Sequence, residues 1–230
     1  FDIGLILDGD ADRIAAVDSK GNYIPPQKIL GLLALHLNQG KKWSGGIVTT
    51  ICGSTMIEHI ARDLKIELHE TPGGFKYISN LMETKDILVG GEAAGGMGLK
   101  NYIPERDGTL AGLMLVEMMI HRKKKIDAIL AAMEKKYGRY YYLRSDKKLK
   151  SKNYKLDPAK LKVAELLGQK VVGVKDYDGT KLICADESWL MFRASGTEPK
   201  MRVYAEAKTL KRAQELIKLG NAIVDREIQY

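Results

Sequence analysis

The chain has 230 residues, 45% of them hydrophobic, which is enough for one large or two ordinary domains with apolar cores. Lys and Arg outnumber Asp and Glu by 37 to 29, and this excess of positive charge attracts phosphate groups, whether on nucleic acid or on small metabolites. No apolar stretch is long enough to cross a bilayer, so we expect no membrane segment. Cys52 and Cys184 lie far apart in apolar or β-branched surroundings, which argues against a disulfide framework or a cysteine metal site and favours a cytoplasmic protein.

The first 22 residues predict a hairpin with an acidic loop at its tip. Residues 1–7 are typical of a buried strand, residues 14–17 of its return strand, and residues 19–22 of the turn that follows. The opening already resembles a strand and lacks the charged region and cleavage site of a secretory signal. We therefore expect the chain to begin inside a fold.

From residue 25 onward, apolar residues at helical spacing alternate with short apolar runs. The pattern predicts helices over residues 25–39, 54–64, 75–84, 110–120 and 126–136, and strands over residues 46–51, 65–70 and 86–91. Strands that alternate with helices indicate an α/β layer with a largely parallel sheet.

After residue 138 the sequence becomes richer in β-formers and more basic. We predict a strand over residues 139–149, a helix around residues 158–167, strands over residues 170–178, 180–186, 188–195 and 201–207, and a final helix over residues 209–226. This order indicates an α+β domain whose strands pair in hairpins, with helices on one face.

The first candidate motif is LDGDADR, in which Asp8, Asp10 and Asp12 occupy every second position. Two like charges about 4 Å apart repel by roughly 4 kcal/mol at an effective dielectric of 20, so clustered carboxylates need a counter-charge. Carboxylate oxygens suit Mg²⁺, which also takes waters and a substrate phosphate. The alternative is an acidic turn closed by Asx hydrogen bonds.

The second candidate is VGGEAAGGMG, in which five glycines surround Glu92 after a predicted strand. Glycine lets a backbone approach a ligand closely, and Glu92 could accept hydrogen bonds from hydroxyl groups. A dinucleotide-binding loop is a poor match, because no G-x-G-x-x-G motif opens a helix here. The alternative is a glycine-rich connection with a solvated glutamate.

The third candidate is FRASGTEPKMRVYAEA, where four residues lie between two apolar strands: Arg193, Ser195, Gly196 and Thr197. Arginine offers a planar set of donors, the hydroxyls add more, and glycine allows the backbone to form an anion-binding nest. These residue types together favour a phosphate cradle. The alternative is an ordinary hairpin turn with a surface arginine.

LDGDADR, TPGGFKYI, GGEAAGG and RASGTEPKMRVY, in this order and spacing, resemble the later part of the α-D-phosphohexomutase family, which includes phosphoglucomutase, phosphomannomutase and phosphoglucosamine mutase. The resemblance covers nearly the whole chain. It implies three parts: residues 1–22 as the end of one α/β domain, residues 23–138 as a complete α/β domain with a mixed sheet, and residues 139–230 as a C-terminal α+β domain.

Enzymes of this family have four domains around a cleft, and a phosphoserine in the first domain transfers its phosphoryl group to a hexose phosphate. The resemblance implies glucose 1,6-bisphosphate as activator or intermediate, and Mg²⁺ to neutralise the transferring group. It implies these roles: Asp8, Asp10 and Asp12 for the metal, Arg13 beside it, Lys76 as a weaker candidate for an active-site cation, Glu92 for sugar hydroxyls, and Arg193, Ser195, Gly196 and Thr197 for the phosphate that does not react.

Two departures from the family pattern matter. The catalytic serine lies in a TASHNP-like motif that these 230 residues lack, and Ser54 is better explained as a helix N-cap. Ala94 stands where the family usually has a serine that would contact a sugar hydroxyl. Neither that contact nor the preferred substrate is therefore settled by the resemblance. We expect a C-terminal piece that partners the N-terminal domains of the same enzyme and binds hexose phosphate without turnover.

Two other classes of function stay open at this point. One is a phosphosugar-binding or regulatory module with no chemistry of its own. The other, a nucleic-acid binder, is disfavoured because no DNA- or RNA-binding motif accompanies the charge. The strands of residues 1–17 are expected to expose unpaired edges, which favours dimerisation.

Overall fold

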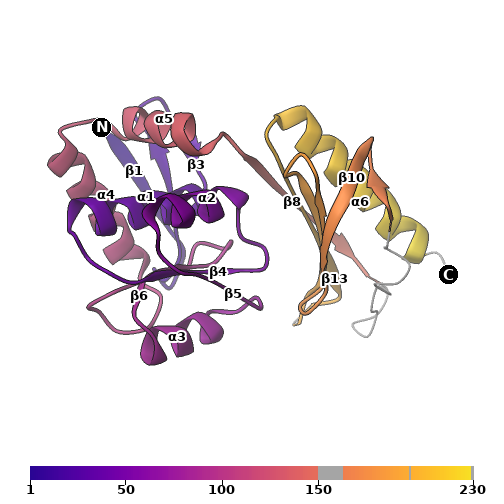
Figure 1. Ribbon diagram of the computed structural model, residues 1–230, viewed down its shortest axis with the longest axis horizontal. Coiled ribbons are helices and arrows are strands. Elements are labelled where there is room, and N and C mark those ends of the chain that lie inside the picture. Colours follow the sequence, from indigo (N-terminus) through magenta and orange to yellow (C-terminus); the bar gives the residue numbers. More distant parts are fainter. Residues whose placement is uncertain (150–162, 197, 229–230) are drawn as a thin grey trace. The chain divides into compact units, whose positions relative to one another are not determined.

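The computed structural model describes residues 1–149, 163–196 and 198–228. The chain forms two compact units, Phe1–Gly138 and Arg139–Tyr230 (Figure 1). The first unit is α/β and the second is α+β, as the sequence predicts. In the described part of the chain, no helix has the length and apolar character that a membrane span requires.

The first unit opens with a small antiparallel sheet in the order β1-β2-β3. Its strands are β1 (Ile3–Leu7), β2 (Ile14–Asp18) and β3 (Tyr23–Ile24). The predicted hairpin is confirmed, with Leu7 opposite Ile14 next to the loop. The prediction of a buried first strand is wrong, because β1 is an edge strand whose side chains are half-buried or exposed.

A second sheet within the described residues has four strands in the order β5-β4-β6-β7. These are β4 (Gly46–Thr50), β5 (Leu68–Thr71), β6 (Ile87–Gly91) and β7 (Met97–Leu99). β4 is parallel to β5 and to β6, whereas β7 returns antiparallel to β6. The sheet is therefore mixed, and the loops that follow β4, β5 and β6 lie at the same edge.

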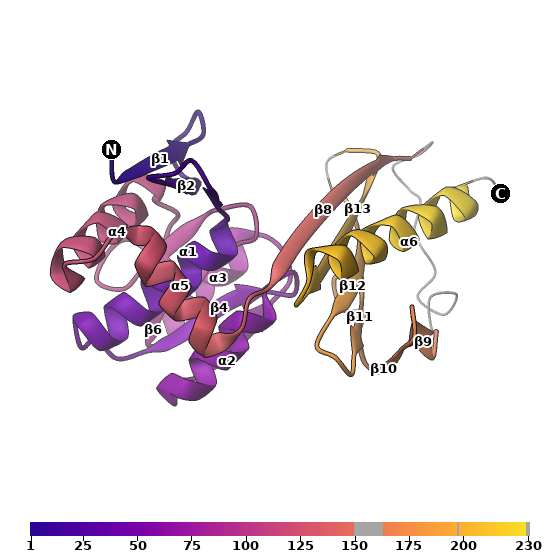
Figure 2. The same cartoon turned by 90° about the horizontal axis from the view of Figure 1, so that it is seen from above.

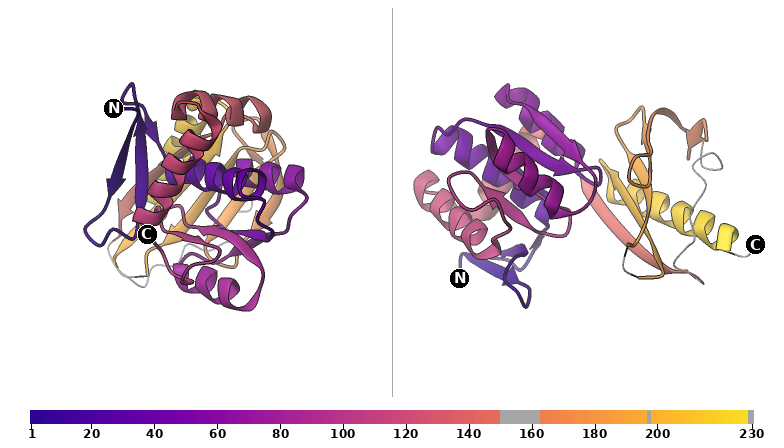
Figure 3. Two further views of the ribbon diagram at one scale, coloured as in Figure 1. Left: turned by 90° about the vertical axis from the view of Figure 1, so that its left-hand side faces the viewer. Right: turned by 90° about the horizontal axis from the view of Figure 1, so that it is seen from below.

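Helices cover both faces of this sheet: α1 (Pro26–Leu35), the π-helical turn η1 (His36–Gly40), α2 (Thr55–Leu64), α3 (Phe75–Thr84), α4 (Gly108–Arg122) and α5 (Ile126–Tyr137). α3 lies on one face and α1 on the other (Figure 3). A Cβ at Gly90 would lie 2.3 Å from Ile78 of α3, and one at Gly91 would lie 2.9 Å from Leu30 of α1. Both helices therefore pack tightly against β6.

Side chains cap two of these helices. The Ser54 hydroxyl accepts a hydrogen bond from the Met56 N–H at 3.2 Å, which confirms the predicted N-cap of α2. The Asp107 carboxylate accepts from the Leu110 N–H at 2.7 Å and begins α4. These caps fix the points at which the two helices leave the loops at the sheet edge.

The second unit is an antiparallel sheet with one long helix. The described strands are β8 (Tyr141–Lys148), β9 (Glu165–Leu166), β10 (Gln169–Lys175), β11 (Thr180–Cys184), β12 (Trp189–Ala194) and β13 (Lys200–Ala207), in the order β8-β13-β12-β11-β10-β9. The helix α6 (Leu210–Ile228) lies along one face (Figure 2). Leu190, Phe192 and Val203 pack against it in the core of this unit.

Two local predictions differ from the structure, and part of one falls outside the described residues. The predicted helix around residues 158–167 is wrong over residues 163–167, which contain β9, while residues 158–162 lie outside the described residues. The strand predicted over residues 65–70 begins only at Leu68, and β7 was not predicted. Cys52 and Cys184 are both buried and are not joined by a disulfide bond.

Candidate functional site

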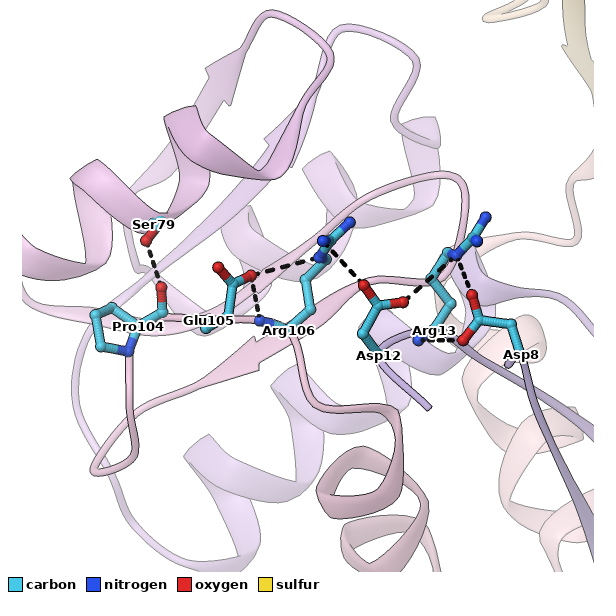
Figure 4. A network of polar contacts seen from close by, with 7 residues as sticks. All are labelled: Asp8, Asp12, Arg13, Ser79, Pro104, Glu105 and Arg106. Carbon is cyan, nitrogen blue, oxygen red and sulfur yellow. Dashed lines mark hydrogen bonds and ion pairs between the residues drawn. The ribbon is translucent and has the colours of Figure 1, made fainter. Parts of the chain in front are cut away.

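The acidic loop (residues 8–13) connects β1 to β2 at the tip of the first hairpin. Ala11 has a left-handed backbone (φ 57°), and its N–H donates to the Asp8 carbonyl at 3.1 Å. This tight turn brings the side chains of Asp8 and Asp12 to Arg13 (Figure 4).

Arg13 supplies the counter-charge within the loop. Its Nε lies 2.5 Å from Asp8 Oδ2 and 3.5 Å from Asp12 Oδ1. Burial acts to raise the pKa of Asp8, but hydrogen bonds from the Arg13 backbone and guanidinium outweigh it and hold that pKa below its usual value. Asp8 is therefore a carboxylate at neutral pH.

The three carboxylates of this loop do not surround a common point. Asp8 and Asp12 face arginines and Asp10 is exposed, and within the described part of the chain no three acidic, histidine or cysteine side chains form a group that could hold a metal ion. The donors nevertheless fit Mg²⁺, which prefers carboxylate oxygens. Asp12 Oδ1 is buried and accepts no hydrogen bond from a described residue, although it forms an ion pair with Arg13 Nε at 3.5 Å. Mg²⁺ binding stays a prediction.

The glycine-rich loop (residues 92–96) connects β6 to β7 and contacts the acidic loop through its backbone. The Ile14 N–H donates to the Gly95 carbonyl at 3.0 Å, and Arg13 pairs with Gly96 in an isolated β-bridge. Gly95 has a φ of 108°, and a Cβ there would lie 2.7 Å from the Ile14 carbonyl oxygen. Only glycine allows this approach.

Glu92 lies at the start of the glycine-rich loop and is half-buried. Its N–H donates to the Gly96 carbonyl at 2.9 Å, and its carbonyl accepts from the Gly95 N–H at 3.0 Å. A Cβ on Gly96 would lie 3.1 Å from Glu92 Oε2, so the carboxylate folds back over that glycine. Ala94 is exposed at the loop tip and offers only a methyl group.

An arginine that the sequence analysis missed completes this part of the site. Arg106 precedes α4, and its Nη2 lies 2.9 Å from Asp12 Oδ2 (Figure 4). Asp12 is 94 positions earlier in the chain, so spacing gave no signal for this pair. Only the return of the chain through β7 brings the two residues together.

Lys76 is exposed in the first turn of α3, where its Nζ lies 4.9 Å from the centre of the Tyr77 ring. The preceding residue, Phe75, is buried, and its ring centre lies 5.7 Å from the Arg106 guanidinium carbon. α3 therefore begins next to Arg106. The role of Lys76 as an active-site cation stays a prediction.

The third motif belongs to the second unit. Arg193 ends β12, and its Nε donates to Asp178 Oδ2 at 2.8 Å. The Ser195 hydroxyl accepts from the Glu198 N–H at 3.3 Å, and a Cβ on Gly196 would meet no atom of a described residue within 4 Å. This loop is open enough for a ligand to approach its backbone. Thr197 lies outside the described residues.

Arg202 is a further cation that the sequence analysis missed. It lies directly opposite Arg193 in the β12–β13 register, and its Nη2 is 3.5 Å from the Ser195 hydroxyl. Like charges at opposed positions repel, and Arg202 Nε is buried without a hydrogen-bond acceptor among the described residues. An anion bound beside Arg202 would supply the acceptor that its Nε lacks among the described residues.

Comparisons with known proteins agree with these features. Residues 25–137 match the domain described as phosphoglucomutase/phosphomannomutase, alpha/beta/alpha domain III. Residues 121–218 match the domain described as phosphoglucomutase/phosphomannomutase, C-terminal domain. A phosphoglucomutase/phosphomannomutase from Thermococcus kodakarensis is 30% identical over 99% of this chain and 48% of its own length. A phosphoglucosamine mutase from Campylobacter curvus is 31% identical over 90% of this chain and 42% of its own length.

Solved structures show the same fold. A protein from Thermus thermophilus superposes with a TM-score of 0.82 at 28% identity, covering 97% of this chain and 46% of that one. The open form of parafusin, a phosphoglucomutase from Paramecium, superposes with a TM-score of 0.79 at 27% identity. The match covers 97% of this chain and 45% of parafusin. The chain thus spans about half the length of the relatives it matches. From these matches and the three motifs, the chain belongs to the phosphoglucomutase/phosphomannomutase family.

Proposed function

We propose that this chain is part of an enzyme that moves a phosphoryl group between the 1- and 6-positions of a hexose phosphate. The observation that carries the proposal is the backbone contact between the acidic loop and the glycine-rich loop, in which Ile14 donates to Gly95 at 3.0 Å. The contact supports the proposal because it joins the loop whose carboxylates suit a metal ion to the loop that carries Glu92, a carboxylate suited to sugar hydroxyls.

The acidic loop would hold Mg²⁺ through Asp8, Asp10 and Asp12. Bound there, Mg²⁺ would neutralise charge on a phosphoryl group. Arg13, which already contacts Asp8 and Asp12, keeps the loop folded and carries a second positive charge. In phosphoryl transfer the protein contributes mainly position and electrostatics, and this loop offers both.

The other two motifs would bind the non-reacting parts of the substrate. Glu92 would accept hydrogen bonds from sugar hydroxyls. Arg193 and Ser195 would bind the phosphate that stays in place, and Arg202, which lies opposite Arg193, would add a second guanidinium. Gly196 leaves room for backbone contact.

The phosphoryl group itself would come from a serine outside these 230 residues, with glucose 1,6-bisphosphate as activator or intermediate. We therefore propose that this chain alone binds hexose phosphate without turnover and that its partner is the N-terminal half of the same enzyme. Several relatives are phosphoglucosamine mutases, so an aminohexose phosphate is a second substrate candidate. Ala94 removes a hydroxyl that would help to distinguish these sugars.

A ³¹P NMR titration of the chain with glucose 1-phosphate, Mg²⁺ and glucose 1,6-bisphosphate tests the proposal. We expect the phosphate resonances to shift or broaden without formation of glucose 6-phosphate. Asp12→Asn should weaken the effect of Mg²⁺, whereas Asp127→Asn, a matched change at the start of α5, should not.

If no resonance responds with or without Mg²⁺, the proposed function is wrong. If glucose 6-phosphate accumulates, the chain carries its own phosphoryl acceptor, and the proposal of binding without turnover is wrong. If the resonances respond to glucose 1-phosphate but Mg²⁺ has no effect, the chain is better described as a phosphosugar-binding module.

A further inference from the structure

The segment that leads into α4 is anchored to both loops of the first unit. The Asp107 N–H donates to the Met97 carbonyl of β7 at 2.9 Å, and the Gly108 N–H donates to the Ala11 carbonyl of the acidic loop at 3.0 Å. A Cβ on Gly108 would lie 2.7 Å from the Arg13 carbonyl oxygen. The backbone on either side of Arg106 therefore has little freedom to move away from the acidic loop.

The Arg106 side chain contacts three elements at once. Its Nη2 binds Asp12 Oδ2 at 2.9 Å in the acidic loop. Its aliphatic stem lies beneath the glycine-rich loop, where a Cβ on Gly96 would lie only 2.5 Å from Arg106 Cδ. Its guanidinium carbon is 5.7 Å from the centre of the Phe75 ring of α3.

This arrangement gives the two oxygens of Asp12 different environments. Oδ2 is held by Arg106 at 2.9 Å, whereas Oδ1 is buried, accepts no hydrogen bond from a described residue and lies 3.5 Å from Arg13 Nε. A second side chain supports Arg106, because the Glu105 carboxylate accepts from the Arg106 N–H at 2.8 Å and lies 3.4 Å from its Nε. Arg106 thus fixes Asp12 through one oxygen, and the other oxygen faces Arg13 inside the acidic loop.

We propose that Arg106 is a positioning residue that couples metal binding in the acidic loop to sugar binding in the glycine-rich loop. The inference rests on the proposed function, because it takes Mg²⁺ and hexose phosphate as the two ligands. Arg106 acts through Asp12 on one side and through the Gly96 backbone on the other. A shift of either loop on binding its ligand must move the same side chain.

The expected signature is a coupling ratio, defined as the affinity for glucose 1-phosphate at saturating Mg²⁺ divided by the affinity without Mg²⁺. Isothermal titration calorimetry of the chain measures both affinities. We expect Arg106→Met to reduce this ratio at least threefold while the melting temperature stays within a few degrees. Direct attraction between Mg²⁺ and phosphate persists in the variant, so the ratio should stay above one.

Arg106→Lys keeps the charge but lacks the planar guanidinium, so it should restore only part of the ratio. Arg62→Met, at an exposed position on α2, is the matched control and should keep the full ratio. The inference is overturned if Arg106→Met retains the wild-type ratio, or if the wild-type chain binds both ligands with a ratio of one. Failure of the wild-type chain to bind either ligand would instead count against the proposed function.

Discussion

The Ile14 N–H donates to the carbonyl oxygen of Gly95 at 3.0 Å, and this hydrogen bond joins the hairpin of β1 and β2 to the mixed sheet of the first unit. Ile14 is buried at the start of β2, and Gly95 is buried in the glycine-rich loop. Two loops with different proposed ligands thus share one backbone contact. A change at this contact should affect both loops.

Gly95→Ala tests the importance of that contact. The added Cβ would lie 2.7 Å from the Ile14 carbonyl oxygen at a φ of 108°, so we expect a loss of at least about 1 kcal/mol in the free energy of unfolding and weaker binding of glucose 1-phosphate. Gly21→Ala is the control, because Gly21 also has a positive φ (81°) but an added methyl group there would meet nothing within 4 Å. Equal stability of the two variants in urea would contradict the prediction.

Arg193→Lys tests the phosphate-binding role of the β12–β13 loop. Lysine keeps the charge but loses the planar donors that match phosphate, so we expect about tenfold weaker binding of glucose 1-phosphate, or about 1.4 kcal/mol. Arg202→Lys should have an effect in the same direction because it lies opposite Arg193. Titration calorimetry provides the measurement, with the exposed Arg226→Lys as control. Unchanged affinity in both variants would remove this loop from the substrate site.

Local sequence signals were sufficient for much of the first unit. The helix predicted over residues 75–84 has those bounds, and the Ser54 N-cap begins α2 as expected, because apolar spacing and capping residues act within one or two turns. β7 has a glycine at its centre and no β-branched residue, so its sequence does not suggest a strand. It forms because β6 supplies an antiparallel partner.

Long-range relationships account for what the sequence did not reveal. Arg106 and Arg202 are ordinary charged residues until the fold places the first beside Asp12 and the second opposite Arg193. The apolar run in β1 predicts burial, but Leu5 and Ile6 are 40% and 47% exposed. Apolar character shows what a strand could bury, and not which element covers it.

Ser54→Ala separates helix capping from chemistry. The Ser54 hydroxyl accepts the Met56 N–H at 3.2 Å, and loss of such a cap costs about 1 kcal/mol of stability. We expect a lower urea midpoint with unchanged affinity for glucose 1-phosphate. Ser54→Asp should recover stability, since aspartate also caps helices. A loss of phosphosugar binding in a folded Ser54→Ala variant would argue that this serine has a second role.

His36 predicts a pH dependence of stability. The ring is 1% exposed, and its Nε2 lies 3.0 Å from Glu117 Oε2, while Lys41, Arg122 and His121 also lie nearby. Burial lowers the pKa of His36 more than the Glu117 carboxylate raises it, so the folded chain keeps the ring neutral where the unfolded chain takes up a proton.

The direction of the pH dependence follows from this difference in proton uptake between the folded and unfolded chain. The contribution of His36 to stability is fully present above the unfolded pKa of about 6.5 and decreases as the pH falls below it, by up to about 1.4 kcal/mol per pH unit. Urea unfolding at pH 7.5, 6.5 and 5.5 should therefore show a larger fall in the free energy of unfolding for the wild-type chain than for His36→Gln. The control is His121→Gln, which removes only the neighbouring ring and should behave like the wild type. If His36→Gln loses stability as steeply as the wild type over this range, the buried ring is not the source of the effect.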